Sequence, residues 1–154
     1  AQRSPPSPWW ATDQPLLNYR VPAWISWRYD IRGLLYWGSM MFWKQVDDPW
    51  AESLTLDRSQ QNPKTIYHGE GSLLYPGRPA GYDGITPSLR LKALRDGSED
   101  YEYLAILRRA GQGDAAMARV QTVARSWFDW DPDPDAYLRV RQELARLILA
   151  LPRP

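Results

Sequence analysis

Two short apolar runs separated by a long connection constrain the fold of this chain more than any other feature. The first is Gly33-Leu34-Leu35-Tyr36-Trp37, and the second is Ser72-Leu73-Leu74-Tyr75, which Pro76-Gly77 ends. Each has the length and composition of a strand buried on both faces, and the connection is long enough for a crossover, so a parallel α/β sheet is predicted. Two strands cannot form a stable sheet alone. The missing strands therefore indicate that the chain is a piece of something larger.

The connection itself, residues 38–65, combines loop signals with large aromatic side chains. Trp43 and Asp48-Pro49-Trp50 lie in its first half, and Gln61-Asn62-Pro63 lies in its second. A structureless connection of this length is uncommon in a compact domain unless it is functional. A buried strand that runs into an aromatic-rich loop is typical of a pocket wall for a sugar or another flat ligand in an α/β enzyme.

Helices are predicted before and after the two apolar runs. Apolar spacing over residues 16–29 predicts a helix, and Pro22 predicts that it is kinked or begins late, near residue 21. Pro87 begins a helix over 88–95, which Gly97 is predicted to interrupt before a fresh helix start at Ser98-Glu99-Asp100 that continues to Gly111.

Two more helices are predicted in the C-terminal part. Asp114 caps one that continues to about Trp127, and Pro134 opens another that continues to about Leu151. The predicted apolar stripe of the last helix consists of Leu138, Leu144, Leu147, Ile148 and Leu151.

The composition excludes several classes of function. The chain has 154 residues, enough for one domain, with a net charge of +1 and no block of like charge that would indicate nucleic-acid binding. No apolar run approaches the ~18 residues of a membrane span. Cysteine is absent and there is one histidine, which argues against thiolate or histidine metal sites and against a serine triad, so no cofactor or metal is predicted. Nine Trp and nine Tyr against two Phe indicate surfaces that meet polar ligands or partners.

The aromatic and charged residues follow, in order and spacing, those of a known family. The series comprises Arg20, Trp24, Trp27, the run 33–37, Trp43, Asp48-Pro49-Trp50, the run 69–77 with its Leu-Tyr-Pro-Gly end, and Ser88 to Leu104. It resembles the C-terminal part of the glycoside hydrolase family 123 catalytic domain over roughly residues 9–107. The segment from Arg90 to Leu104 is a quite specific part of the resemblance, and the Leu-Tyr-Trp and Leu-Tyr-Pro-Gly ends agree with the family in order and spacing.

This resemblance implies the C-terminal portion of a (β/α)8 barrel. Residues 33–37 would be its seventh strand, residues 72–75 its eighth, and residues 87–110 its closing helix. Residues 1–111 would then belong to the barrel, and residues 112–154 would form a C-terminal helical extension.

The resemblance also implies substrate-assisted, retaining hydrolysis of the β-N-acetylhexosaminidase type. In such enzymes an Asp orients the substrate acetamide, whose oxygen attacks the anomeric carbon, and an adjacent Glu protonates the leaving oxygen. No Asp-Glu dipeptide occurs in this sequence, so the pair is expected upstream of Ala1. Asp47-Asp48 precedes a proline and fits a turn, and Glu99-Asp100 fits a helix cap, so neither pair replaces it. No catalytic residue is assigned within the chain.

The predicted substrate-binding residues are Trp37, Trp43, Tyr36 and Tyr75, which lie at or after the predicted strand ends. A Trp face can cover the C–H face of a pyranose, although Trp37 and Trp43 fit core packing equally well. Because Tyr36 and Trp37 alternate along a strand, only one of them can point to the barrel axis.

Four further residues receive secondary assignments. Tyr82 follows the second run and is also placed near the site. Glu70, between two glycines, is either structural or a hydrogen-bond acceptor for sugar hydroxyls, whereas Arg90 and Arg95 are expected to pair with carboxylates near the barrel rim.

Two functions remain open from the sequence. The first is a glycoside hydrolase piece that contributes pocket aromatics but is inactive as an isolated chain. The second is a non-catalytic carbohydrate-binding or structural module. The expected partners are a hexosaminide-like glycan and the N-terminal part of the same barrel, with no nucleic acid and no membrane. The family resemblance alone suggests a secreted or periplasmic location.

Overall fold

The computed structural model describes residues 7–36, 49–50, 54–56 and 66–152. These residues form four α-helices: α1 (Val21–Arg28), α2 (Leu89–Arg109), α3 (Gly113–Val123) and α4 (Pro134–Leu149). They also form two antiparallel pairs of strands, β1 (Leu54–Leu56) with β2 (Ile66–His68) and β3 (Leu74–Pro76) with β4 (Ile85–Pro87). Short 3-10 helices lie at Leu16–Tyr19 (η1) and Arg78–Ala80 (η3).

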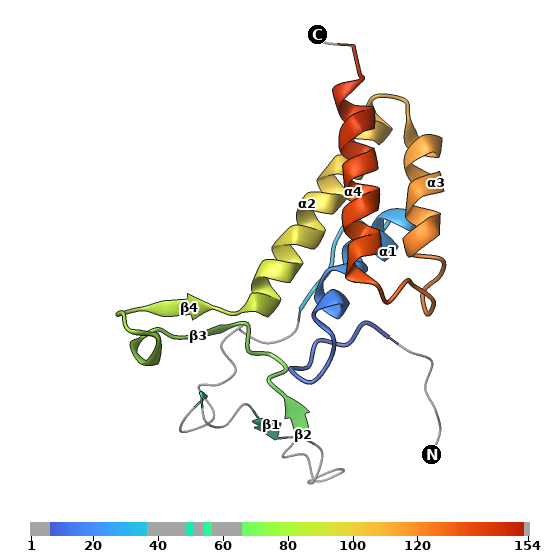
Figure 1. Cartoon of the computed structure of the whole chain (residues 1–154). Helices are drawn as coiled ribbons and strands as arrows, with labels where there is room; N and C mark the ends of the chain where they lie inside the picture. Colours follow the sequence, from blue (N-terminus) through green and yellow to red (C-terminus); the bar gives the residue numbers. More distant parts are fainter. Residues whose placement is uncertain (1–6, 37–48, 51–53, 57–65, 153–154) are drawn as a thin grey trace.

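The helices form one body, and the strand pairs lie beyond one end of it. Helix α2 packs against α1, α3 and α4, and α3 also packs against α4 (Figure 1). Figure 1 shows both strand pairs at the N-terminal end of α2, with β4 leading directly into that helix. The fold therefore mixes helices and strands, but its described strands are antiparallel.

Local signals place the starts of α1, α2 and α4 where the sequence predicts them. Pro22 falls in the first turn of α1, where its missing N–H costs no hydrogen bond, so the predicted late start near residue 21 is confirmed. The hydroxyl of Ser88 accepts a hydrogen bond from the Leu91 amide at 3.3 Å and caps α2. Asp133 caps α4 in the same way, just before Pro134.

The predicted break at Gly97 is wrong, because α2 continues without interruption from residue 89 to 109. A Cβ atom at position 97 would lie 2.8 Å from the carbonyl oxygen of Arg20 and 3.3 Å from the Cβ of Ala23. Gly97 is therefore needed where α2 meets the backbone at the start of α1, not as a helix breaker. Glu99 and Asp100 lie within α2, so they are not the cap of a new helix.

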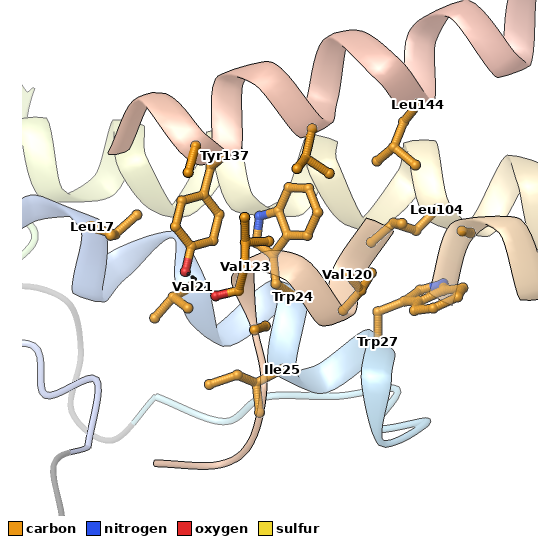
Figure 2. Close-up of a cluster of buried hydrophobic side chains, with 14 of the residues drawn as sticks. Leu17, Val21, Trp24, Ile25, Trp27, Leu104, Val120, Val123, Tyr137 and Leu144 are labelled. Carbon is orange, nitrogen blue, oxygen red and sulfur yellow. Dashed lines mark hydrogen bonds between the residues drawn. The ribbon is translucent and has the colours of Figure 1, made fainter. Parts of the chain in front are cut away.

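The main hydrophobic core is formed by all four helices. Trp24 and Trp27 of α1 lie against residues that include Val120, Tyr137 and Leu144 (Figure 2). The Trp24 and Tyr137 rings meet edge to face, with centroids 5.5 Å apart and planes at 78°. Residues after position 111 thus share one core with those before it.

Three details of the C-terminal helices differ from the predictions. Asp114 does not cap α3 but lies inside it, because the helix begins at Gly113 and its N-cap residue is Gln112. Helix α3 ends at Val123 rather than near Trp127, because Ala124 leaves the helix and bridges to Trp130. In α4 the buried positions include Tyr137, Val140 and Leu144, whereas Leu138 is exposed. The predicted stripe was therefore correct only in part.

The predicted strand over residues 33–37 is wrong for residues 33–36, which form no strand; Trp37 lies outside the described residues. Leu35 is 96% exposed and Leu34 is 55% exposed. A run of this kind is buried only where neighbouring strands and covering helices surround it, and the described residues do not surround it here.

The second predicted strand, 72–75, is found as β3 at residues 74–76, but its partner is β4, to which it is joined by a glycine-rich turn. The Gly77 amide donates to the Gly84 carbonyl at 2.7 Å and closes this hairpin. The predicted parallel pairing is therefore wrong for β3.

Candidate functional site

A tight turn between β2 and β3 is the anchor for the two predicted tyrosines. Gly69 and Gly71 have positive φ angles of 63° and 78°, and a Cβ at Gly69 would lie 2.2 Å from the hydroxyl oxygen of Thr12. Only glycine fits such a position without strain. The Gly71 amide donates to the hydroxyl of Tyr36 at 2.5 Å.

Arg90, in the first turn of α2, joins this turn to Tyr75. Its buried guanidinium donates to the carbonyl oxygens of Gly69, at 2.8 Å, and of Ser72. It also donates to the hydroxyl of Tyr75 at 2.7 Å and to that of Tyr19 at 3.4 Å. An arginine has only donors, so each of these oxygens acts as an acceptor. Tyr75 is thereby held in one orientation from inside the protein.

The sequence-based expectation for the two arginines was therefore half right. Arg90 pairs with carbonyl and phenol oxygens rather than with a carboxylate. Arg95 is exposed and contacts two carboxylates, Asp96 at 2.8 Å and Glu99 at 3.5 Å.

Tyr75 lines a cleft of about 580 Å³ together with Trp50, a residue that the sequence reasoning did not assign to the site. The two rings lie 5.3 Å apart and are tilted by 50°. The indole Nε1 of Trp50 donates to the carbonyl of Pro76 at 3.0 Å. The sequence signal was available, because Trp50 ends the Asp48-Pro49-Trp50 loop segment.

Tyr36 lines two other clefts, of about 600 and 610 Å³, which both include residues of the segment 31–36. Its ring lies 4.8 Å from that of Trp10, and burial raises the pKa of its phenol, which favours the protonated hydroxyl. Tyr36 and Tyr75 therefore line different clefts. Tyr19 lines both the cleft of about 600 Å³ that contains Tyr36 and the cleft of about 580 Å³ that contains Tyr75.

The other sequence-based candidates are distributed as follows. Trp37 and Trp43 lie outside the described residues. Tyr82 is half exposed, and its hydroxyl accepts a hydrogen bond from Thr86 at 2.5 Å on the β3–β4 hairpin. Glu70 lies in the glycine turn and lines one of the clefts that contain Tyr36.

Glu99 and Asp100, the adjacent carboxylates among the described residues, are both used in ion pairs. Asp100 is fully buried and accepts hydrogen bonds from Arg20, Trp24 and Arg141. Glu99 pairs with Arg141 at 2.8 Å. The ion pairs and hydrogen bonds of these groups hold helices together. Asp47 and Asp48 lie outside the described residues.

Within the described part of the chain, no group of three or more His, Asp and Glu is placed to bind a metal ion. None of the described helices combines the length and apolar character needed to cross a membrane.

Comparison with known proteins gives one family. The sequence model described as "Glycoside hydrolase 123, catalytic domain" matches residues 4–107, which include all of the turn, Arg90, both tyrosines and Trp50. No curated protein matches the chain.

Proposed function

Because this chain belongs to glycoside hydrolase family 123, we propose that it is part of a β-N-acetylhexosaminidase-like enzyme and supplies aromatic residues to its sugar pocket. A carbohydrate is the substrate class that the family implies. The observation that best supports a binding role is the cleft beside Tyr75, where a buried arginine holds the phenol and an aromatic ring forms the adjoining wall. Aromatic walls with a few fixed polar groups are typical of small-molecule sites.

The proposed reaction is substrate-assisted and retaining. The acetamide oxygen of the substrate attacks the anomeric carbon, an Asp orients the acetamide, and a Glu gives its proton to the leaving oxygen. We place this Asp-Glu pair upstream of Ala1 in the encoded protein, since the sequence contains no such dipeptide. The roles proposed within the chain are those of substrate binding, for Tyr36, Tyr75, Trp37 and Trp43.

The exposed segment around Leu34 and Leu35 supports the view that the chain completes a larger barrel. Apolar side chains of this size are normally covered, and a clustered exposed group indicates an interaction surface. On this proposal, residues 33–37 become a barrel strand only when the neighbouring strands are present. Residues 1–111 would belong to that barrel and 112–154 would extend it, although both parts share one core.

Hydrolysis of an aryl N-acetyl-β-galactosaminide tests the proposal. We expect no turnover by the isolated chain and clear turnover by the protein encoded with its upstream sequence. Turnover by the isolated chain would contradict the assignment of the acid to an upstream segment.

A non-catalytic carbohydrate-binding module is the second candidate. It is favoured by the use of Asp100 and Glu99 in ion pairs, which leaves them no catalytic role. Binding of the glycoside without turnover by the longer protein would select this candidate.

A further inference from the structure

Trp50 has an unusual combination of exposure and fixed orientation. It is 45% exposed, yet its indole N–H is bonded to the Pro76 carbonyl and its ring rests against Tyr75. A large apolar ring left in contact with water is unfavourable unless something covers it. A ring that is already held in place also loses little freedom when a ligand binds.

Tyr75 lines the same cleft, and its hydroxyl is held in a fixed direction by Arg90. It accepts a hydrogen bond from Arg90, so its own proton remains to be donated. No acceptor for this proton is found among the residues that the structure describes. Thr12 and Gln14 are polar residues that also line this cleft. With a volume of about 580 Å³, the cleft falls within the ~300–1,000 Å³ range of ligand sites.

An aromatic ring beside a fixed phenol hydroxyl matches the apolar face and the polar edge of a pyranose. The C–H face of the sugar is apolar and flat, and it excludes water when it packs on an aromatic ring. The hydroxyls at the sugar edge need partners with a fixed direction, which the phenol of Tyr75 provides. A nucleotide or another anion would need an accessible cation, and the guanidinium of Arg90 is buried and already bonded to four oxygens.

We infer that Trp50 is a sugar-stacking residue, and that it and Tyr75 form a binding subsite for one pyranose ring of an N-acetylhexosaminide. The class of sugar rests on the proposed function, whereas the platform itself rests on the geometry of the cleft. Arg90 also lines this cleft, but its buried guanidinium is already bonded to four oxygens, one of them the Tyr75 hydroxyl, so we assign it the role of a positioning residue for Tyr75.

The test is titration of the chain with methyl N-acetyl-β-galactosaminide, followed by NMR of the tryptophan indole N–H signals. We expect the Trp50 signal, assigned from its loss in Trp50→Phe, to shift on binding. Trp50→Ala should weaken binding about tenfold, as expected for the loss of an aromatic contact. Trp50→Phe should retain part of the affinity.

Trp127→Ala is the matched control, because Trp127 is 44% exposed and lies outside the Tyr75 cleft. It should bind the glycoside like the unmodified chain. Circular dichroism confirms the fold of each variant, and Trp50→Phe carries the test if Trp50→Ala does not fold. Tyr75→Phe should weaken binding while leaving the Trp50 signal responsive.

Failure of this inference and failure of the proposed function are distinguishable. If the unmodified chain binds and Trp50→Ala binds equally well, Trp50 has no such role and the proposed function stands. If methyl β-galactoside binds as tightly as the acetamido sugar, the platform stands and the N-acetylhexosaminide class is wrong. If the unmodified chain binds neither sugar, both the subsite and the binding role proposed for this chain are overturned.

Discussion

Removal of the Asp100 carboxylate is the most informative single change in the helical body. One carboxyl oxygen accepts hydrogen bonds from Arg20 Nε at 2.6 Å and from Trp24 Nε1 at 2.9 Å. The other accepts from Arg20 Nη2 at 3.0 Å and Arg141 Nη1 at 3.1 Å. The side chain is fully buried, so water cannot replace these partners. Asp100 therefore ties the start of α1 and helix α4 to the middle of α2.

The magnitude of Asp100→Ala follows from what the change leaves behind. Arg20 is itself buried, and both of its side-chain hydrogen bonds among the described residues go to Asp100. Removing one member of a buried ion pair costs about 3–5 kcal/mol, since the other charge stays buried without a partner. The free energy of unfolding of a domain is only about 5–15 kcal/mol, so the variant should lose a large part of it.

Urea denaturation followed by tryptophan fluorescence measures this loss. We expect Asp100→Ala to lower the urea midpoint strongly and the melting temperature by roughly 10 °C or more. Asp129→Ala is the control, because Asp129 makes the same type of two-bonded pair with Arg125 on the surface. Solvent screens that exposed pair, and its removal should change the midpoint little. Equal midpoints for the two variants would refute the reasoning.

Three further predictions concern packing, titration and exposure. Gly97→Ala should lower the melting temperature in spite of the better helix propensity of alanine, because the new Cβ would lie 2.8 Å from the Arg20 carbonyl oxygen. Gly113→Ala is the control and should not lower it, because the nearest non-neighbouring atom to its new Cβ lies 3.9 Å away; equal melting temperatures for the two variants would contradict this reasoning. Burial raises the pKa of the Tyr137 phenol, so above about pH 10 the unfolded chain loses this proton before the folded chain does, and the free energy of unfolding falls as the pH rises. In Tyr137→Phe the urea midpoint should therefore fall less steeply with pH above about pH 10. An unchanged dependence of the midpoint on pH would exclude Tyr137 as its cause. Leu35→Glu should leave the melting temperature of the isolated chain unchanged but lower activity of the longer protein, because Leu35 is 96% exposed here and is proposed to be covered there.

The starts of α1, α2 and α4 could be predicted from the sequence because their signals are local, whereas α3 begins at Gly113 without the predicted Asp114 cap. Ser88, Pro134 and Pro22 each act within one turn of their own position, and the helix starts follow from them. The break predicted at Gly97 failed for the opposite reason, since the need for glycine there comes from Arg20, which is far away in the chain. A glycine required by tertiary packing and one that ends a helix look alike in sequence.

The strands were harder to predict because their burial depends on partners. The run 33–36 has the composition of a buried strand, but composition does not create the neighbouring strands that would bury it. The hairpin of β3 and β4 does have a local signal in the sequence. Its turn contains Gly81 and Gly84, both with positive φ, which allow the chain to reverse and pair with itself.

The cleft could be predicted only in part. The position of Tyr75 at a strand end can be read from the local sequence, but the residue that holds its hydroxyl, Arg90, lies elsewhere in the chain. Arg90 reaches Tyr75, Ser72, Gly69 and Tyr19, which lie 15, 18, 21 and 71 residues away. Ten residues further along the same helix, Asp100 bonds to Arg20 and Arg141, 80 and 41 residues away. Helix α2 thus connects the cleft at its first turn to the core at its middle. Both anchoring charges on this helix, Arg90 and Asp100, therefore depend on partners that are fixed elsewhere in the fold.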